Sequence, residues 1–175
     1  HGQVTLDISL LHSAALERLE VALSTSPMVR LGRTTFEIAE ALVENNCDYS
    51  DLLDDATPAG HLTLSLRAPT VFRSGDAQSV MPTPSQVFGH LRSVWTEWAP
   101  SHLAPDLDLR EIPIFVDRLD GVTKSITLRN REWIGFTGTV GFDLSKASDR
   151  DRRVLCALAL LAPFSGIGAN TTLGM

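Results

Sequence analysis

The sequence predicts an α+β protein in which strands and amphipathic helices alternate along the chain. Apolar and polar residues alternate over residues 62–67, a period of two that is typical of a half-buried strand. Between residues 87 and 98 apolar residues recur at helical spacing, and Pro100 ends the pattern. Both patterns return elsewhere in the chain, so each unit of the protein is expected to contain both kinds of element.

The composition is that of an ordinary globular protein. The 175 residues are 43% hydrophobic and 21% charged, enough for one substantial core or two small ones. No apolar run approaches the roughly 20 residues that cross a membrane, and no secretory leader is expected. Cys47 and Cys156 form no metal-ligand spacing, so we expect a cytoplasmic protein without a metal or cofactor. The net charge of −6 argues against a large nonspecific polyanion surface.

The first part of the chain predicts a strand, a helix and further strands. Alternation over residues 4–10 predicts the first strand, and leucines at helical spacing then predict a helix that Pro27 ends. Residues 28–43 predict one or two strands with a kink at Gly32. The polar, acidic residues 44–60 predict a connection to the next unit.

The rest of the chain predicts a second set of elements. The Asp120-Gly121 pair is the strongest hairpin signal in the sequence. We expect strands at residues 62–66, 112–119, 124–129 and 133–144, and helices at residues 87–98 and 149–161. One side of the strand at 133–144 carries Gly135, Thr137, Thr139 and Gly141, which pack little of their own, so something else could lie against it.

This order of elements predicts tandem ferredoxin-like domains, of which the first is incomplete. The second unit reads strand, helix, strand, strand, helix, which is the ferredoxin-like order without its last strand. The first unit matches the back half of the same fold, without an opening strand and helix. We therefore expect residues 1–55 to form part of an N-terminal domain and residues 61–175 to form a C-terminal domain that ends in a glycine-rich loop.

The most informative stretch is the glycine-rich end, residues 165–175. Glycines allow another backbone to approach closely, and such a turn exposes backbone N–H groups that suit phosphate oxygens. The alternative is an ordinary glycine-rich connection. The candidate phosphate-binding residues are Gly166, Gly168, Asn170, Thr171, Thr172 and Gly174.

Basic residues gather in the part of the sequence that predicts a β-hairpin. Such side chains could contact successive phosphates, although a solvated edge whose charges discourage aggregation is the alternative. These residues are Arg118, Lys124, Arg129 and Arg131. Arg73 is a weaker phosphate-binding candidate, and Trp133 could either stack a base or pack in the structure. Trp95 and Trp98 lie on an apolar helical stripe and are expected in the core.

The glycine-rich end resembles the C-terminal loop of the CRISPR-associated RAMP proteins, and above all that of their repeat-cleaving endoribonuclease family. Residues 166–175 carry the resemblance, and segments 27–32, 68–72, 82–84 and 135–138 resemble other parts of that family in the same order. The resemblance implies tandem ferredoxin-like (RAMP/RRM-like) domains that bind CRISPR repeat RNA, or precursor crRNA, and cut it without a metal. The glycine-loop residues and the four basic residues named above would contact the RNA.

The reaction that the resemblance implies is attack by a ribose 2′-hydroxyl on the adjacent phosphate, which leaves a 2′,3′-cyclic phosphate. Histidine suits the proton transfers because its pKa lies near working pH. In this family the catalytic histidine lies early in the first domain, and none of the five histidines here sits in a matching context. We therefore expect the catalytic segment to lie outside this chain. His90, on the polar side of its helix, is the least ordinary of the five.

Two other functions remain open at this point. A RAMP RNA-binding subunit would hold guide RNA in a CRISPR effector complex, with other effector subunits as partners, and would cut nothing. The third possibility is a ferredoxin-like scaffold that binds no RNA. A homodimer is compatible with each of these functions. A histidine in the missing N-terminal part, facing the glycine loop, would favour the enzyme.

Overall fold

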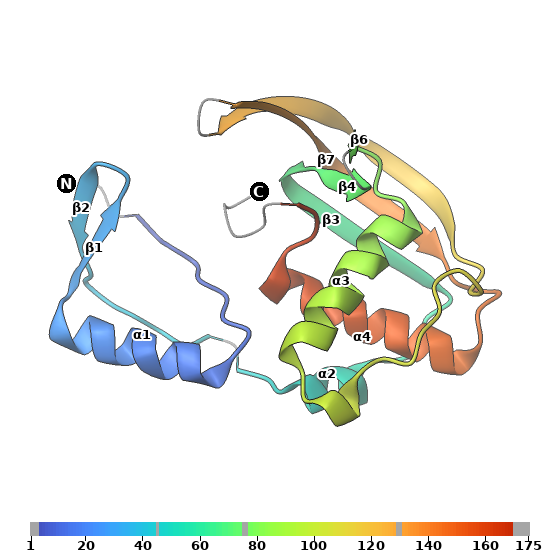
Figure 1. Ribbon diagram of the computed structural model, residues 1–175, viewed down its shortest axis with the longest axis horizontal. Coiled ribbons are helices and arrows are strands. Elements are labelled where there is room, and N and C mark those ends of the chain that lie inside the picture. Colours follow the sequence, from blue (N-terminus) through green and yellow to red (C-terminus); the bar gives the residue numbers. More distant parts are fainter. Residues whose placement is uncertain (1–3, 45, 75–76, 129–130, 170–175) are drawn as a thin grey trace. The chain divides into compact units, whose positions relative to one another are not determined.

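The computed structural model of the protein describes residues 4–44, 46–74, 77–128 and 131–169. Contacts between residues divide the chain into a first unit that runs to Asp48 and a second that begins at Tyr49 (Figure 1). Both units combine helices with antiparallel strands, which confirms the α+β class. Among the described helices, none has the length and apolar character needed to cross a bilayer.

The first unit is a helix followed by a two-stranded hairpin. Helix α1 (Ser13–Thr25) begins where the Nδ1 atom of His12 accepts a hydrogen bond of 3.2 Å from a backbone amide in the first turn, so His12 caps the helix. Strands β1 (Met28–Leu31) and β2 (Thr34–Glu37) pair antiparallel. Gly32 adopts a φ of 63° between them, which glycine reaches without strain. The predicted helix is confirmed. Two strands lie within the predicted range 28–43, but the second ends at Glu37, and Gly32 belongs to the turn between them instead of a kink.

The strand predicted over residues 4–10 is wrong. This segment is described without strand pairing, and its apolar side chains are exposed, by 61% at Val4 and 55% at Ile8. An alternating segment becomes a strand only where a neighbour supplies backbone hydrogen bonds and covers its apolar side. No strand in the described part of the chain does this for residues 4–10.

The second unit is built around a three-stranded antiparallel sheet with β7 at its centre. Across the sheet the strands are β3 (His61–Thr70), β7 (Arg131–Asp143) and β6 (Phe115–Leu128). A small hairpin, β4 (Phe72–Ser74) and β5 (Ala77–Ser79), follows β3. The helices are α2 (Tyr49–Asp55), α3 (Pro84–Trp98) and α4 (Asp149–Ser165), with a short 3-10 helix η1 (Ser101–Leu103). Apart from the small elements β4, β5 and η1, the order β3, α3, β6, β7, α4 is the predicted strand, helix, strand, strand, helix, but the strands expected at 112–119 and 124–129 form the single strand β6.

Helices α3 and α4 pack together and bury the core of the second unit against one face of its sheet (Figure 1). The rings of Phe88 on α3 and Phe142 on β7 meet edge to face, with centroids 5.1 Å apart. Other side chains buried here are Val87, Leu91, Trp95, Val140, Leu155 and Leu158. The opposite face, which we call the open face, exposes polar side chains of β3 such as Thr63 and Ser65.

The hairpin turn predicted at Asp120-Gly121 is wrong, because both residues lie inside the continuous strand β6. Gly121 pairs with Gly138 of β7. A Cβ atom on Gly121 would collide with the carbonyl oxygen of Thr137, and one on Gly138 would collide with that of Asp120. These glycines therefore serve a close approach of two strands and not a turn.

The acidic segment predicted as a connection, residues 44–60, contains helix α2. Leu52 of this helix is buried, and the Tyr49 ring meets the Trp95 ring edge to face at 5.0 Å. One buried leucine and one tyrosine among so many acidic residues are a weak helical signal. The helix depends on its packing against α3 and α4.

Two helix ends also differ from the prediction. Helix α4 continues past Pro163 to Ser165, since a proline so close to the C-terminal end disturbs only the last turn. Trp98 is 44% exposed, whereas Trp95 is buried as predicted and donates its indole N–H to the Leu103 carbonyl oxygen at 2.8 Å. The predicted core position of Trp98 is therefore wrong: it is the last residue of α3, where the chain leaves the core.

Candidate functional site

The described part of the glycine-rich loop is docked beside the end of strand β3. The Ala169 amide donates a hydrogen bond of 2.6 Å to the carbonyl oxygen of Val71, the residue that follows β3. Ile167, between two glycines, is buried. The loop is therefore anchored both by its backbone and by one apolar side chain.

Gly166 and Gly168 occupy positions that require glycine. Gly166 follows α4 with a φ of 69°, and its amide donates to the Ala162 carbonyl oxygen. Gly168 has a φ of 101°, and a Cβ atom there would lie 2.6 Å from Thr70 Cγ2 and 2.8 Å from the Val71 carbonyl oxygen. A larger residue at 168 would push the loop off β3. Because the Gly166 amide is used by the helix end, phosphate binding by this loop would depend on other amides.

Several predicted site residues lie outside the described part of the chain. These are Asn170, Thr171, Thr172 and Gly174 of the loop, together with Arg129. The backbone of Arg131 is described: it begins β7 and pairs with Leu128. Its side chain, like the residues just named, lies outside the described part of the structure.

The imidazole of His90 lies beside the glycine loop. His90 is on α3, and its ring interacts with the backbone of Gly166. Burial lowers the pKa of His90 below its ordinary value of 6.5, and the interaction with Gly166 offsets only part of this effect. Its Nε2 atom is buried without a hydrogen-bond partner among the described residues. The ring is therefore neutral near neutral pH.

The basic candidates do not form one cluster. Arg118 and Lys124 both lie on the open face of β6, but six residues apart. At roughly 3.3 Å per residue, about 20 Å separates them along the strand. Lys124 pairs with Gly135, which adjoins Phe136, and Phe136 pairs with Thr70 at the place where the loop docks. Lys124 therefore shares one end of the sheet with the glycine loop, and Arg118 lies at the other end.

We call the end of the sheet around Arg118 the paired end, because its acidic and basic side chains lie in pairs. The Nε2 atom of His61 lies 2.6 Å from Oδ2 of Asp117, and the guanidinium of Arg118 lies 3.8 Å from Oδ2 of Asp120. These four residues define the paired end. Such exposed pairs add little stability, but they leave little net charge for an anionic ligand.

We call the opposite end the loop end, defined by Val71, Arg73, Lys124, Trp133 and Gly168. Lys124 is exposed, and no carboxylate in the described ranges forms an ion pair with it. The guanidinium carbon of Arg73 lies 5.9 Å from the centroid of the Trp133 ring. Exposed basic groups, an aromatic ring and a docked glycine loop thus occur together here. This combination suits a phosphate-bearing, base-bearing ligand.

Sequence reasoning missed that Thr70 and Val71 receive the glycine loop. Thr70 is 4% exposed, and Val71 and the following Phe72 are buried. Their only signal in the sequence is a short run of β-branched and aromatic residues, 70–72, beyond the end of the strand predicted at 62–66. Pairing with a loop almost one hundred residues later leaves no local pattern.

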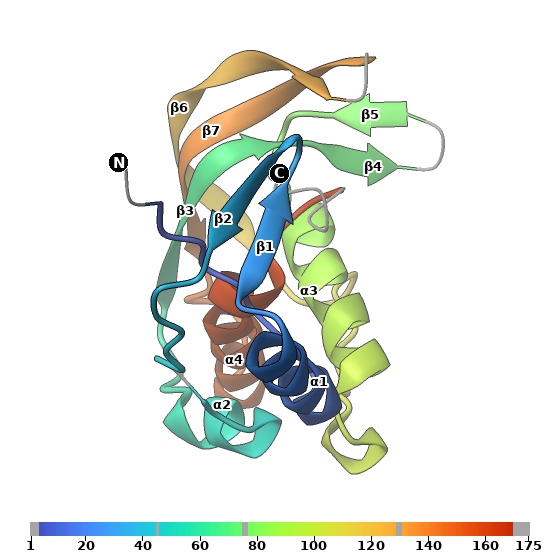
Figure 2. The same ribbon diagram turned by 90° about the vertical axis from the view of Figure 1, so that its left-hand side faces the viewer.

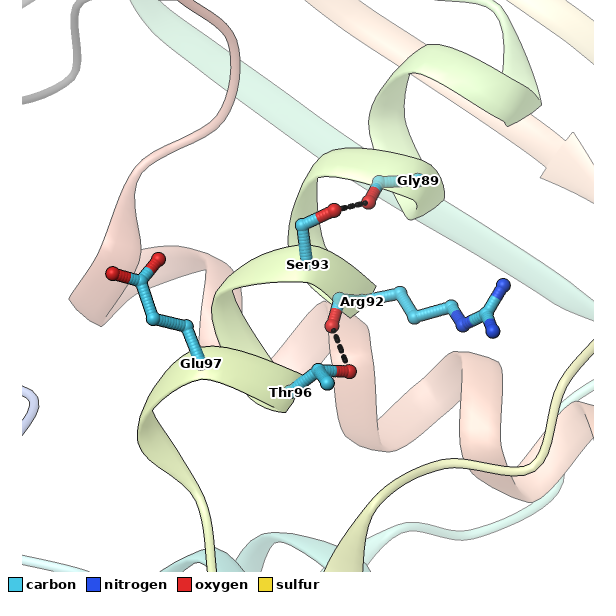
Figure 3. A pocket seen from close by; sticks show the side chains of 5 residues that line it. All are labelled: Gly89, Arg92, Ser93, Thr96 and Glu97. Carbon is cyan, nitrogen blue, oxygen red and sulfur yellow. Dashed lines mark hydrogen bonds between the residues drawn. The ribbon is translucent and has the colours of Figure 1, made fainter. Parts of the chain in front are cut away.

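An open groove runs along the exposed side of α3 (Figure 3). It is lined by Gly89, Arg92, Ser93, Thr96 and Glu97, which recur at helical spacing. The Ser93 and Thr96 hydroxyls donate hydrogen bonds of 2.9 Å to the carbonyl oxygens of Gly89 and Arg92. Because the helix itself satisfies these hydroxyls, the groove offers a ligand little beyond the ends of two charged side chains.

Comparisons with known proteins point to one family. The family described as CRISPR-associated endoribonuclease Cas6 matches residues 64–175. This match spans the sheet, α3, α4 and the glycine loop. Among curated proteins, none matches the chain.

Solved structures of Cas6 proteins share the fold of this chain. A Cas6 product complex is 27% identical, covers 94% of this chain and 71% of its own, and superposes with a TM-score of 0.80. The same protein in a substrate-mimic complex is 27% identical, covers 94% and 74%, and gives 0.78. A Cas6 of Thermus thermophilus, 23% identical over 73% of this chain and 55% of its own, gives 0.63 and supports the fold alone.

Proposed function

The chain belongs to the Cas6 family of CRISPR-associated endoribonucleases, and we propose that it binds the repeats of CRISPR precursor RNA and cleaves them without a metal ion. Two of the similar Cas6 structures are a product complex and a substrate-mimic complex. These support RNA as the ligand of this chain. We further propose that the two units belong to a tandem ferredoxin-like arrangement in which the first domain is incomplete, as the element order supports.

The proposed reaction is a transesterification within the RNA strand. The 2′-oxygen of one ribose attacks the adjacent phosphorus, and the bond to the 5′-oxygen of the next nucleotide breaks. The products are a 2′,3′-cyclic phosphate and a 5′-hydroxyl. A base must take the 2′-hydroxyl proton and an acid must protonate the leaving oxygen. Cations or N–H donors stabilise the charge that develops on the phosphate oxygens.

The loop end would supply the phosphate contacts. We assign them to Lys124, to Arg131 and to the loop beyond Ala169, whose own amide is bonded to Val71. Arg118 contributes less, because Asp120 already compensates its charge. In this proposal the other loop glycines, with Asn170, Thr171 and Thr172, shape the path of the RNA.

His90 acts in this proposal as a positioning residue. Its ring interacts with the backbone of Gly166, where the glycine loop leaves α4. Its buried Nε2 atom is not presented to solvent, so we do not assign it a proton transfer with the RNA.

The observation that carries the proposal is the docking of the glycine loop on β3 at the end of the sheet that holds uncompensated basic side chains. An ordinary connection between two elements would need neither the Ala169–Val71 hydrogen bond nor the space that only a glycine at 168 leaves. The site therefore combines a fixed loop backbone with cations, as phosphate recognition requires.

The test is incubation of the full-length protein with its host's CRISPR repeat RNA in EDTA. Cleavage that leaves a 2′,3′-cyclic phosphate supports the proposed enzyme. Replacing the ribose on the 5′ side of the cut by deoxyribose should abolish cleavage, because the attacking 2′-hydroxyl is then absent. Tight binding without cleavage would instead favour a non-catalytic RNA-binding subunit, and no binding would contradict both.

A further inference from the structure

Arg73 and Trp133 form a contact at the loop end that the function proposed above does not use. The guanidinium carbon lies 5.9 Å from the centroid of the indole ring, within the range of a cation–π interaction. Arg73 is exposed and Trp133 is partly exposed. Part of the tryptophan surface is therefore accessible to a ligand.

The fold brings these two residues together near the point where β3 ends. Thr70, the last residue of β3, pairs with Phe136 of β7; Arg73 follows on β4, and Trp133 lies near the start of β7. A Cβ atom on Gly135 would lie 2.6 Å from the carbonyl carbon of Pro69. Glycine at 135 therefore allows β7 and β3 to approach closely near the Arg73–Trp133 contact. Figure 2 shows the β4–β5 hairpin and the end of the β6–β7 hairpin projecting at the same end of the sheet.

The surroundings of the Arg73–Trp133 contact match a single RNA nucleotide. Trp133 is two residues from Gly135, the partner of Lys124, so the lysine and the indole lie on the same face of the sheet as diagonal neighbours. The docked glycine loop is bonded to Val71, two residues before Arg73. A basic side chain and the docked glycine loop thus lie near the same aromatic ring.

Aromatic rings and arginine planes are the groups on which proteins stack unpaired bases. Stacking tolerates any base, because each base has a π face, and it adds to the backbone contacts made by neighbouring cations. A base can stack on such a ring only where the RNA is single-stranded, since a paired base is stacked within its own helix.

We propose that Trp133 and Arg73 form a stacking site for one unpaired nucleobase of the RNA that passes the glycine loop. The base stacks on the Trp133 indole, and Arg73 fixes the indole and adds a positive charge beside the base. This proposal rests on the proposed function, because it requires that the chain bind RNA. It assigns recognition of a single-stranded position, and no chemical step, to these residues.

The test is a double-mutant cycle between protein and RNA. The full chain is titrated with the repeat RNA of its host's CRISPR array, and with versions in which one nucleotide at a time is abasic. The protein variants are Trp133→Ala, Trp133→Phe and the control Trp98→Ala, which removes an exposed tryptophan at the end of α3. The cycle isolates the pairwise contribution of one base and one side chain.

One abasic position should weaken binding to the wild-type protein by about 5- to 150-fold, the range measured for base–aromatic stacking. In Trp133→Ala the same abasic change should not weaken binding further. In Trp133→Phe it should still cause most of the affinity loss seen in the wild type. Trp98→Ala should behave as the wild type. Arg73→Ala, which leaves the ring in place, should reduce the effect without removing it.

Two failures can be distinguished. In the first, the wild-type chain binds the repeat RNA, but every abasic change lowers the affinity by the same factor in Trp133→Ala as in the wild type. The Arg73–Trp133 contact is then structural, and the stacking proposal alone is overturned. If the wild-type chain does not bind the repeat RNA, the proposed function and the stacking site are overturned together.

Discussion

The two ends of strand β6 carry similar residues on the open face and yet offer a ligand different surfaces. At each end a basic side chain lies opposite a glycine of β7, Arg118 opposite Gly141 and Lys124 opposite Gly135. At the paired end, Asp120 compensates the arginine. At the loop end no described carboxylate pairs with the lysine, and the glycine loop docks nearby.

The two glycines opposite these basic residues leave space for different neighbouring groups. A Cβ atom on Gly141 would lie 2.9 Å from the Cβ of Arg118 and 3.3 Å from Nε2 of His61, so this glycine makes room for the His61–Asp117 pair. Gly135 makes room for the backbone of β3 just before Arg73. The same residue type thus makes room for a pair of side chains at one end and for the backbone of β3 at the other. A count of basic residues in a sequence window cannot separate these two situations.

The largest expected effect on RNA affinity comes from Gly168→Val, which should detach the glycine loop from β3. The positive φ and the collision with Thr70 and Val71 should cost about 1–3 kcal/mol in backbone strain and release the loop from β3. We expect RNA affinity to fall at least tenfold, measured by titration. The matched control is Gly60→Ala near the paired end, where the nearest atoms to the added Cβ lie 3.9 and 4.0 Å away. Equal affinity in the two variants would contradict the role of the docked loop.

A smaller effect, on the stability of the fold, is expected from His90→Gln. This variant tests whether stability depends on the neutral imidazole beside the glycine loop. Because burial lowers the pKa of His90, the unfolded chain takes up a proton first as the pH falls below about 6.5, and the folded state loses stability. Chemical denaturation at pH 8 and pH 5 should therefore show a smaller acid-induced loss in the variant than in the wild type. Parallel losses in both proteins would show that protonation of His90 does not disturb the fold.

The smallest effect is expected from Asp120→Asn, which makes the paired end resemble the loop end. The Arg118–Asp120 pair is exposed, and such pairs contribute about 0.2–1 kcal/mol. Freeing the arginine should raise RNA affinity by no more than about fivefold at low salt. The gain should disappear when Arg118→Ala is added. A gain that persists in the double variant would come from the lost negative charge alone.

Most elements of the second unit were predictable from the sequence because their signals are local. The stripe that includes Phe88 and Trp95 predicted α3, and alternation over 62–67 predicted β3. The continuous strand β6 was not predictable, because the reason for Gly121 is its partner Gly138, which lies 17 residues further along the chain. A glycine that serves a close approach and one that serves a turn look the same in the sequence.

The candidate site was predictable in composition but not in arrangement. The glycine loop and Lys124 were identified as candidates from their residue types. Their distance from Arg118, and the docking of the loop on Val71, follow from strand register and from contacts distant in sequence. The placement of His90 beside Gly166 is of the same kind, since helix periodicity gives the side of α3 and not its neighbour.

The most direct test of the contrast between the two ends is the salt dependence of RNA affinity in Lys124→Ala and Arg118→Ala. Each phosphate contact with single-stranded RNA contributes about 0.7 to the slope of log affinity against log salt concentration. We expect Lys124→Ala to reduce this slope by about 0.7 and Arg118→Ala to leave it unchanged. A reduced slope in Arg118→Ala with an unchanged slope in Lys124→Ala would contradict this expectation.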